Sequence, residues 1–259
     1  MRSRIDILII CTAICLVILA STFLFPYGFS AIHEGWVAGF WLFISNTGGT
    51  IGVPVITLVF CIVISLHYKG WFKKMLFLTL SLLGFSVVLG GFAKLNEHFI
   101  KENLRIERPN IIYLHNQKDF DSEEFYNLPT KADRQKYLKE FLNEKGPDFI
   151  TFDDKPIHPK VLQHWLNETG FSFPSGHSVN AFLMATLMSY LLLFTYEDFR
   201  RRTFFILPFL WATLVALSRV ILGVHSPTDI ALGALIGSLI AYLIIVTGII
   251  DKYLKQKEN

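Results

Sequence analysis

Two histidines, three basic side chains and one carboxylate stand in three short motifs along this chain of 259 residues. Fixed cations bind phosphate oxygens, an imidazole can attack phosphorus or protonate a leaving oxygen, and a carboxylate can orient an imidazole. The motifs therefore contain the groups that phosphoryl transfer through a histidine needs. In chain order they are Lys101 with Arg108-Pro109, then Pro174-Ser175-Gly176-His177, then Ser218-Arg219 followed by His225 and Asp229.

The third motif needs the most specific surroundings of the three, because it contains an arginine at membrane depth. Arg219 lies near the end of an apolar run, where a guanidinium at membrane depth costs about 2.5–3.5 kcal/mol on insertion scales. Arg219 is therefore a candidate functional residue. The alternative interpretation is an arginine whose side chain extends to the lipid headgroups. Ser226, Pro227 and Asp229 have the spacing of an N-cap, a first helical residue and a capping box. Asp229 could be only that cap, but four residues after His225 it can also accept an imidazole N–H and leave the other nitrogen free to attack.

The second motif stands at the start of a predicted helix. The free N–H groups and the dipole at such a start favour phosphate, and Gly176 after Ser175 lets an anion approach the backbone. His177 is placed to protonate a leaving oxygen. An ordinary capped helix with an interfacial histidine would show the same residues.

The first motif is the weakest taken alone. Lys101 and Arg108 are seven residues apart, which predicts one shared helix face over two turns, and Pro109 is expected to end that helix. Lys94 and Arg105 compete for the same role. Taken together, the three motifs favour a shared functional site over three separate structural roles, because all of them fall at the outer ends of different predicted helices.

The elements that must position these residues are membrane helices. The chain is 52% hydrophobic and only 17% charged, which is typical of a polytopic membrane protein. The small net charge of +3, without a basic stripe, argues against a nucleic-acid partner. We expect an all-α fold, because six segments have roughly the 20 apolar residues that a span needs. They are Ile7–Phe25, Ile51–His67, Met75–Leu95, Ser178–Thr195, Thr203–Leu222 and Ile230–Ile250.

Lysine and arginine predict the orientation of these spans. The loop over Pro26–Thr50 has neither residue, and the positive-inside rule therefore puts both termini in the cytoplasm and this loop outside. The active site then faces the periplasm, with a bacterial inner membrane as the expected location. The basic residues that carry this prediction are Arg2, Arg4, Lys69, Lys73, Lys74, Arg200, Arg201, Arg202, Lys252, Lys255 and Lys257.

One long polar loop lies between the third and fourth spans. Thr130–Asn143 is predicted to be a helix, with Thr130 and Asp133 as a capping box and Gly146-Pro147 as its stop. A second helix is expected around Pro159–Glu168. We therefore expect a single domain over residues 1–259, with residues 98–175 forming a small helical periplasmic cap within it.

The complete pattern, Lys-x6-Arg-Pro, Pro-Ser-Gly-His and Ser-Arg-x5-His-x3-Asp, resembles the signature of the type 2 phosphatidic acid phosphatase superfamily. The chain matches every signature position. Further stretches resemble a bacterial branch of that family, as do the chain length and the size of the long loop. These stretches are Glu123-Glu124-Phe125-Tyr126, His164-Trp165-Leu166-Asn167-Glu168-Thr169-Gly170 and Phe171–His177.

The resemblance implies a covalent mechanism. His225 would be the nucleophile, Asp229 would orient it, and His177 would be the general acid. It implies no cofactor, and the sequence shows no convincing metal cluster. The groups that would bind the phosphate are Lys101, Arg108, Ser175, Gly176 and Arg219.

The expected activity is hydrolysis of phosphatidylglycerol phosphate to phosphatidylglycerol, with undecaprenyl pyrophosphate, phosphatidate and diacylglycerol pyrophosphate as further substrates. The partners would be membrane lipids within the bilayer, and no protein partner is evident. A dedicated undecaprenyl-pyrophosphate phosphatase is the first alternative, and a phosphotransferase or lipid A phosphatase is another. A transporter or binding protein for phosphate-bearing lipids would explain the cations, but not the pairing of His225 with Asp229.

Overall fold

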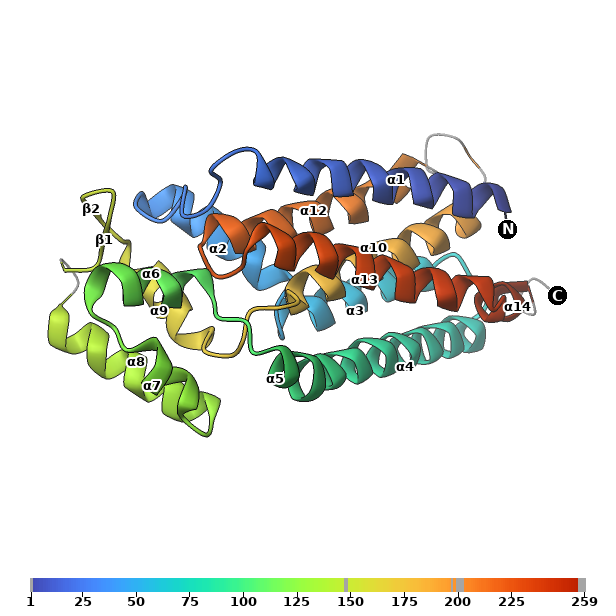
Figure 1. The fold of residues 1–259 in the computed structure, drawn as a ribbon. Coiled ribbons are helices and arrows are strands. Elements are labelled where there is room, and N and C mark those ends of the chain that lie inside the picture. The colour runs from blue at the N-terminus through green and yellow to red at the C-terminus, as the bar shows by residue number, and fades with distance from the viewer. Residues whose placement is uncertain (1, 147–148, 197, 199–202, 256–259) are drawn as a thin grey trace.

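The protein is a helix bundle with a group of short helices at one end (Figure 1). This computed structural model describes residues 2–146, 149–196, 198 and 203–255. Within them, regular structure is helical apart from one two-stranded hairpin, which confirms the all-α prediction. The helices are α1 (Arg2–Ala20), α2 (Gly35–Thr47), α3 (Gly52–Ser65), α4 (Trp71–Leu95), α5 (Lys101–Leu104), α6 (Pro109–Lys118), α7 (Ser122–Asn127), α8 (Lys131–Lys145), α9 (Pro159–Asn167), α10 (Gly176–Thr195), α12 (Ile206–Ile221), α13 (Pro227–Val246) and α14 (Ile249–Lys255). Short turns are the 3-10 segments η1 (Ser21–Phe23) and η3 (Thr203–Phe205) and the π-helical η2 (Asn96–Ile100), and the strands are β1 (Thr151–Phe152) and β2 (Lys155–Pro156).

Five helices are long and apolar enough to cross a membrane, and the bent pair α2–α3 would make a sixth span. This agrees with the predicted number. The prediction that Pro26–Thr50 is wholly a loop was wrong, because its second half forms α2. The run from Trp36 to Ile44 is almost entirely apolar. Gly48 and Gly49 then interrupt the helix, and α3 leaves at an angle of 64° to α2.

Helix α10 lies at the centre of the bundle, where it packs against α13, α12, α1, α3 and α4. Nearly all of its side chains are buried. By contrast, most of α4 faces outward. The third signature motif runs from the last turn of α12 to the first turn of α13, and the second begins α10, so both stand on helices that pack around the centre of the bundle.

The short helices form a second hydrophobic cluster beside the first. We call α6 to α9 with the hairpin β1–β2 the cap. Its core includes Ile111, Phe125 and Trp165, and it continues onto α2 and onto Leu222 at the end of α12. The indole N–H of Trp165 donates to the backbone carbonyl of Leu222 at 2.9 Å. The cap is therefore packed directly onto the turn that carries the third motif.

The predicted cap helices are confirmed with small changes in their ends. Helix α8 has Thr130 as its N-cap, and the hydroxyl of Thr130 accepts from the backbone N–H of Asp133 at 3.1 Å. Helix α9 ends at Asn167. The hairpin between them was not predicted. Pro147, Arg200 to Arg202 and Lys257 lie outside the described residues.

Close contact between α10 and α13 depends on glycine. A Cβ atom on Gly237 would lie 2.2 Å from the carbonyl oxygen of Val179 and 3.0 Å from the backbone nitrogen of Leu183. We expect Gly237→Ala to lower the free energy of unfolding by about 1–3 kcal/mol, because the two helices must move apart. Thermal unfolding in detergent measures the effect.

The control is Gly84→Ala in α4, where an added Cβ meets nothing within 4 Å. Helix propensity alone favours alanine there by about 1 kcal/mol. Equal changes at the two positions would contradict the packing argument.

Candidate active site

The turn between α12 and α13 folds back on Arg219. The backbone N–H groups of Val224 and His225 donate to the Arg219 carbonyl at 3.0 and 3.1 Å. Gly223 has a φ of 75°, a conformation that glycine adopts without strain. Ser226 then caps α13 and forms the predicted capping box with Asp229. His225 is thereby held between two helix ends.

Both ring nitrogens of His225 have defined neighbours. Nε2 lies 3.2 Å from Nη1 of Arg108, and Nδ1 lies 3.4 Å from Oδ2 of Asp229. A guanidinium has only donors, so Nε2 must carry the lone pair and Nδ1 the proton. Burial and the Arg108 charge lower the pKa of His225 to about 3. The imidazole is therefore neutral, with its unprotonated nitrogen directed at Arg108.

Ser172 joins His225 to Asp229. Its hydroxyl donates to Oδ2 of Asp229. The hydroxyl oxygen lies 3.2 Å from Nδ1 of His225, so it can accept a hydrogen bond from Nδ1–H. The same Oδ2 accepts from the backbone N–H of Ser226 at 2.6 Å. Asp229 is therefore both the helix cap and the partner of the imidazole, and the two interpretations of its role are compatible. Ser172 had no assigned role in the sequence, although it lies in a stretch that resembles the family.

Arg108 lies between helices rather than on one. Helix α5 ends at Leu104, Arg105 has a left-handed φ of 48°, and Pro109 begins α6 instead of ending a helix. The expected helix face shared by Lys101 and Arg108 was therefore wrong. Proline disfavours helical geometry in the residue before it and suits the first helical position, so Arg108 is extended.

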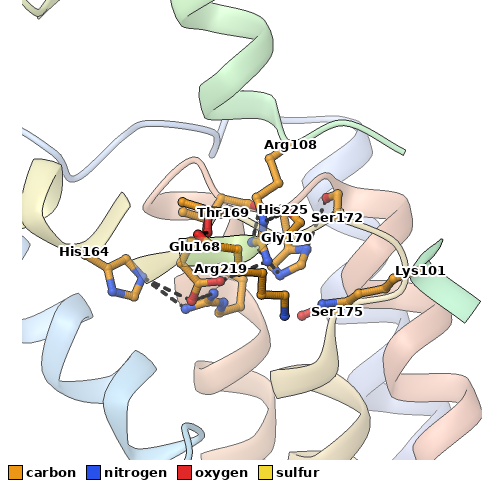
Figure 2. A network of polar contacts seen from close by, with 12 residues as sticks. Lys101, Arg108, His164, Glu168, Thr169, Gly170, Ser172, Ser175, Arg219 and His225 are labelled. Atoms are coloured by element: carbon orange, nitrogen blue, oxygen red, sulfur yellow. Dashed lines mark hydrogen bonds and ion pairs between the residues drawn. The ribbon is translucent and has the colours of Figure 1, made fainter. Parts of the chain in front are cut away.

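The extended Arg108 side chain is buried and uses each of its nitrogens. Nε donates to the Gly170 carbonyl at 2.7 Å, and Nη1 donates to the Val224 carbonyl at 3.1 Å. Nη2 lies 3.0 Å from Oε2 of Glu168. These contacts fix the guanidinium next to His225 (Figure 2).

Arg219 projects from the last turn of α12 and is fully buried. Its Nη1 donates to the Ser45 hydroxyl and lies 3.1 Å from Nε2 of His164, and its Nη2 donates to Oε1 of Glu168. Its Nε has no acceptor among the described residues. The interpretation as an arginine that reaches the headgroups is therefore wrong, because the side chain points into the protein.

Glu168 lies between the two arginines. Its side chain is 13% exposed, and its two oxygens contact Arg108 and Arg219 separately. Burial alone would raise the pKa of Glu168, but the charges of Arg219 and Arg108 hold that pKa well below its usual value. Neither Glu168 nor His164 was predicted as a site residue. Both lie in a stretch that resembles the family, but no short spacing signalled their contacts.

The second motif begins α10 as predicted. Ser175 is the N-cap, and its backbone N–H donates to the Asp229 carbonyl at 3.1 Å, which joins α10 to the third motif. His177 follows in the first turn, where its Nε2 lies 3.4 Å from the position of a Cβ on Gly49 in the α2–α3 break. His177 also helps to lower the pKa of Glu168, which places it within electrostatic reach of the arginine pair.

Lys101 approaches from another side of the site. Its buried ammonium group pairs with Glu97. Figure 2 shows its side chain pointing toward Ser175. Lys101 is therefore near the start of α10. Its ion pair is with Glu97, whereas both arginines pair with Glu168. Among the described residues, no group of three or more His, Cys, Asp or Glu side chains is arranged to hold a metal ion.

The two neutral histidines predict acid sensitivity. Burial and the Arg219 charge lower the pKa of His164 to about 4, and the pKa of His225 is about 3. An unfolded histidine titrates at about 6.5. Below that pH the unfolded chain binds protons that the folded chain does not, so the free energy of unfolding falls. We expect the unfolding temperature in detergent to drop between about pH 7 and 5.

Replacing His164 with Gln should flatten this pH dependence by removing one such group. The exposed His98 is the control, and His98→Gln should leave the slope as in the parent protein. A slope that is the same for all three proteins would show that His164 is not a neutral buried group.

Comparisons with known proteins place the chain in a family. A model of the PAP2 superfamily matches residues 77–249, which include all three motifs. The chain is 35% identical over 175 residues to phosphatidylglycerophosphatase B of Escherichia coli (strain K12), covering 64% of this chain and 62% of that protein. The match thus spans less than two thirds of the relative. The protein of the same name from Haemophilus influenzae is 31% identical over 223 residues, 85% of this chain and 83% of the relative.

The crystal structure of a transmembrane PAP2 type phosphatidylglycerolphosphate phosphatase from Bacillus subtilis has a similar fold. It superposes with a TM-score of 0.51 and 19% identity, over 97% of this chain and 96% of that one. Together with the candidate spans, this similarity identifies a multi-pass integral membrane protein. By its family match and its relatives, the chain belongs to the PAP2 superfamily.

Proposed function

We propose that this protein is a lipid phosphate phosphatase that converts phosphatidylglycerol phosphate to phosphatidylglycerol and phosphate through a phosphohistidine. Family membership and the names of the two relatives support the reaction and the substrate class. The observation that carries the proposal is the arrangement of His225. Its Nδ1 faces Asp229 and Ser172, and its unprotonated Nε2 faces a cationic site.

The chemistry follows from this tautomer. Nε2 of His225 donates its lone pair to phosphorus, and the bond from phosphorus to the leaving oxygen breaks. His177 gives its proton to that oxygen, and phosphatidylglycerol departs as an alcohol. The imidazolium that forms is stabilised by Asp229 through Nδ1–H. Water then attacks the phosphohistidine, His177 takes the proton of that water, and phosphate leaves with His225 neutral again.

The surrounding donors suit a transferring phosphoryl group. Such a group carries about −1.5 to −2 charges as a monoester, and its transition state spreads charge over three oxygens. Arg108 and Arg219 are fixed by several contacts each, and the start of α10 adds N–H groups at Ser175 and Gly176. We assign Lys101 to the same phosphate. Donors that are fixed before the reaction need no reorganisation during it.

The remainder of the substrate belongs in the bilayer. An apolar groove of about 320 Å³ lies beside α4, lined by residues that include Gly84, Leu187 and Tyr253. This groove lies at the α14 end of the bundle, away from His225, so we place the acyl chains in the bilayer beside the part of α4 that leads to Lys101. The proposal also includes three expectations from the sequence. The protein lies in the inner membrane, the cap is on the periplasmic side, and the chain is a single domain with an insert over residues 98–175.

Phosphate release from phosphatidylglycerol phosphate by purified protein in detergent tests the function. We expect His225→Ala to reduce release by at least about 10³-fold, as removal of a covalent nucleophile does. The fold of the variant is checked by its unfolding temperature. Undecaprenyl pyrophosphate is assayed in parallel. Turnover of that substrate alone would assign the protein to the carrier lipid instead, and release that persists in the variant would contradict the covalent mechanism.

Ser172→Ala should lower kcat about 10–100-fold, because the imidazolium would lose part of its hydrogen-bonded support. The matched control is Ser189→Ala at the far end of α10, whose hydroxyl donates to the Phe205 carbonyl at 2.6 Å. The turnover numbers of both variants, measured with saturating substrate, test the role of Ser172. Equal values for the two variants would remove Ser172 from the mechanism.

A further inference from the structure

The two arginines assigned to phosphate already hold an anion that belongs to the protein. Glu168 Oε2 contacts Arg108, and Oε1 contacts Arg219. Figure 2 shows the carboxylate between the two guanidiniums, next to His225. A carboxylate and a phosphate accept from the same N–H groups in similar geometry. Glu168 therefore occupies donors that a bound phosphate requires.

The other donors of these guanidiniums cannot substitute. On Arg108, Nε and Nη1 donate to the carbonyls of Gly170 and Val224, which are parts of the backbone. On Arg219, Nη1 donates to Ser45, and only Nε lacks an acceptor among the described residues. A phosphate can use that N–H without disturbing Glu168, and each Nη2 has one further N–H beside the bond to the carboxylate. Because Glu168 lies between the two guanidiniums, a phosphate that takes the place facing both Nη2 groups requires the carboxylate to move.

We propose that Glu168 is a specificity-determining residue: a resident carboxylate that only an anion of higher charge displaces from Arg108 and Arg219. A phosphate monoester carries about −1.5 to −2 charges and can replace it with a gain of electrostatic energy. The phosphodiester of an ordinary phospholipid carries one negative charge, the same as the carboxylate, and gains nothing. Glu168 would thus keep the headgroups of bulk phospholipids out of the site. This inference rests on the proposed function.

The displaced carboxylate has a partly polar space near it. A cavity of about 390 Å³ lies between α2 and α9, and its walls include Lys160, His164 and Asn167. His164 is part of that wall and lies 3.8 Å from Oε1 of Glu168. Glu168 itself follows the last residue of α9, so its side chain can turn without breaking that helix.

Binding of inorganic phosphate tests the competition without any turnover. Titration calorimetry on the purified protein gives Kd for the parent, for Glu168→Gln and for Glu102→Gln, which neutralises an exposed carboxylate one residue from Lys101. We expect Glu168→Gln to bind phosphate about tenfold more tightly, as the loss of one competing charge-assisted contact implies. Glu102→Gln should change Kd less than twofold, roughly the effect of a screened surface charge.

Glu168→Asp keeps the charge but shortens its reach, so its Kd should lie between those of the parent and Glu168→Gln. It also provides the test if the glutamine variant does not fold. Unchanged or weaker phosphate binding in a folded Glu168 variant would overturn the inference, since Glu168 would then only hold the arginines in place. The same tightening in Glu102→Gln would overturn it too, because the effect would come from net charge.

A second assay tests selectivity. Hydrolysis of a water-soluble phosphate monoester is measured with increasing short-chain phosphatidylglycerol, a phosphodiester. We expect inhibition of Glu168→Gln at concentrations about tenfold lower than for the parent protein. Equal inhibition would refute the selective role. A failure of the proposed function is distinguishable, because it would appear as absent lipid turnover in the parent while the phosphate-binding result stood.

Discussion

The carboxylate shared by Arg108 and Arg219 is the interaction on which the site depends. Arg219 comes from the bundle, Glu168 from the end of α9 in the cap, and Arg108 from the link that precedes the cap. Each charge is buried, and removal of one partner from a buried pair commonly costs about 3–5 kcal/mol, because the other is left uncompensated. The cap and the bundle are therefore held in register by the same groups that we propose to bind phosphate. Trp165 reinforces this register by its bond to Leu222.

A second constraint joins local structure to chemistry. Asp229 accepts from the backbone of Ser226 and also faces His225, so the start of α13 and the tautomer of the imidazole are set by one carboxylate. The Ser175 N–H donates to the carbonyl of the same Asp229 and brings the start of α10 to this point. Glycines between α10 and α13 keep those two helices close along their length. The separation between the start of α10 and the imidazole follows from this packing.

The parts of the site that could be predicted are those that short-range spacing determines. Ser226, Pro227 and Asp229 make a capping box within four residues, and this was recognisable because its geometry is local. The geometry at Lys101 and Arg108 was mispredicted, because a periodicity argument was extended across a proline that reorganises the backbone. Helix α2 was missed because it reaches a membrane span's length only together with α3.

Contacts between distant residues could not be predicted from spacing. Glu168 meets Arg219 across 51 residues, and Ser172 meets Asp229 across 57. A glutamate after a short amphipathic helix is indistinguishable in sequence from a solvated one. Its burial arises only when α9 packs on the bundle, which depends on the whole arrangement of α2, α9 and α12. The missed residues are therefore those on the cap side of the site.

The separation of these residues along the chain has a consequence for the newly made protein. Arg108 meets His225 across 117 residues, so the chain must be made beyond residue 225 before the imidazole gains its cationic neighbour. The shortest segment that contains His225 together with Arg108, Ser172 and Asp229 runs from residue 108 to residue 229. A nascent chain that ends before Asp229 therefore lacks part of the site. The complete site can form only after both the cap and the start of α13 have been made.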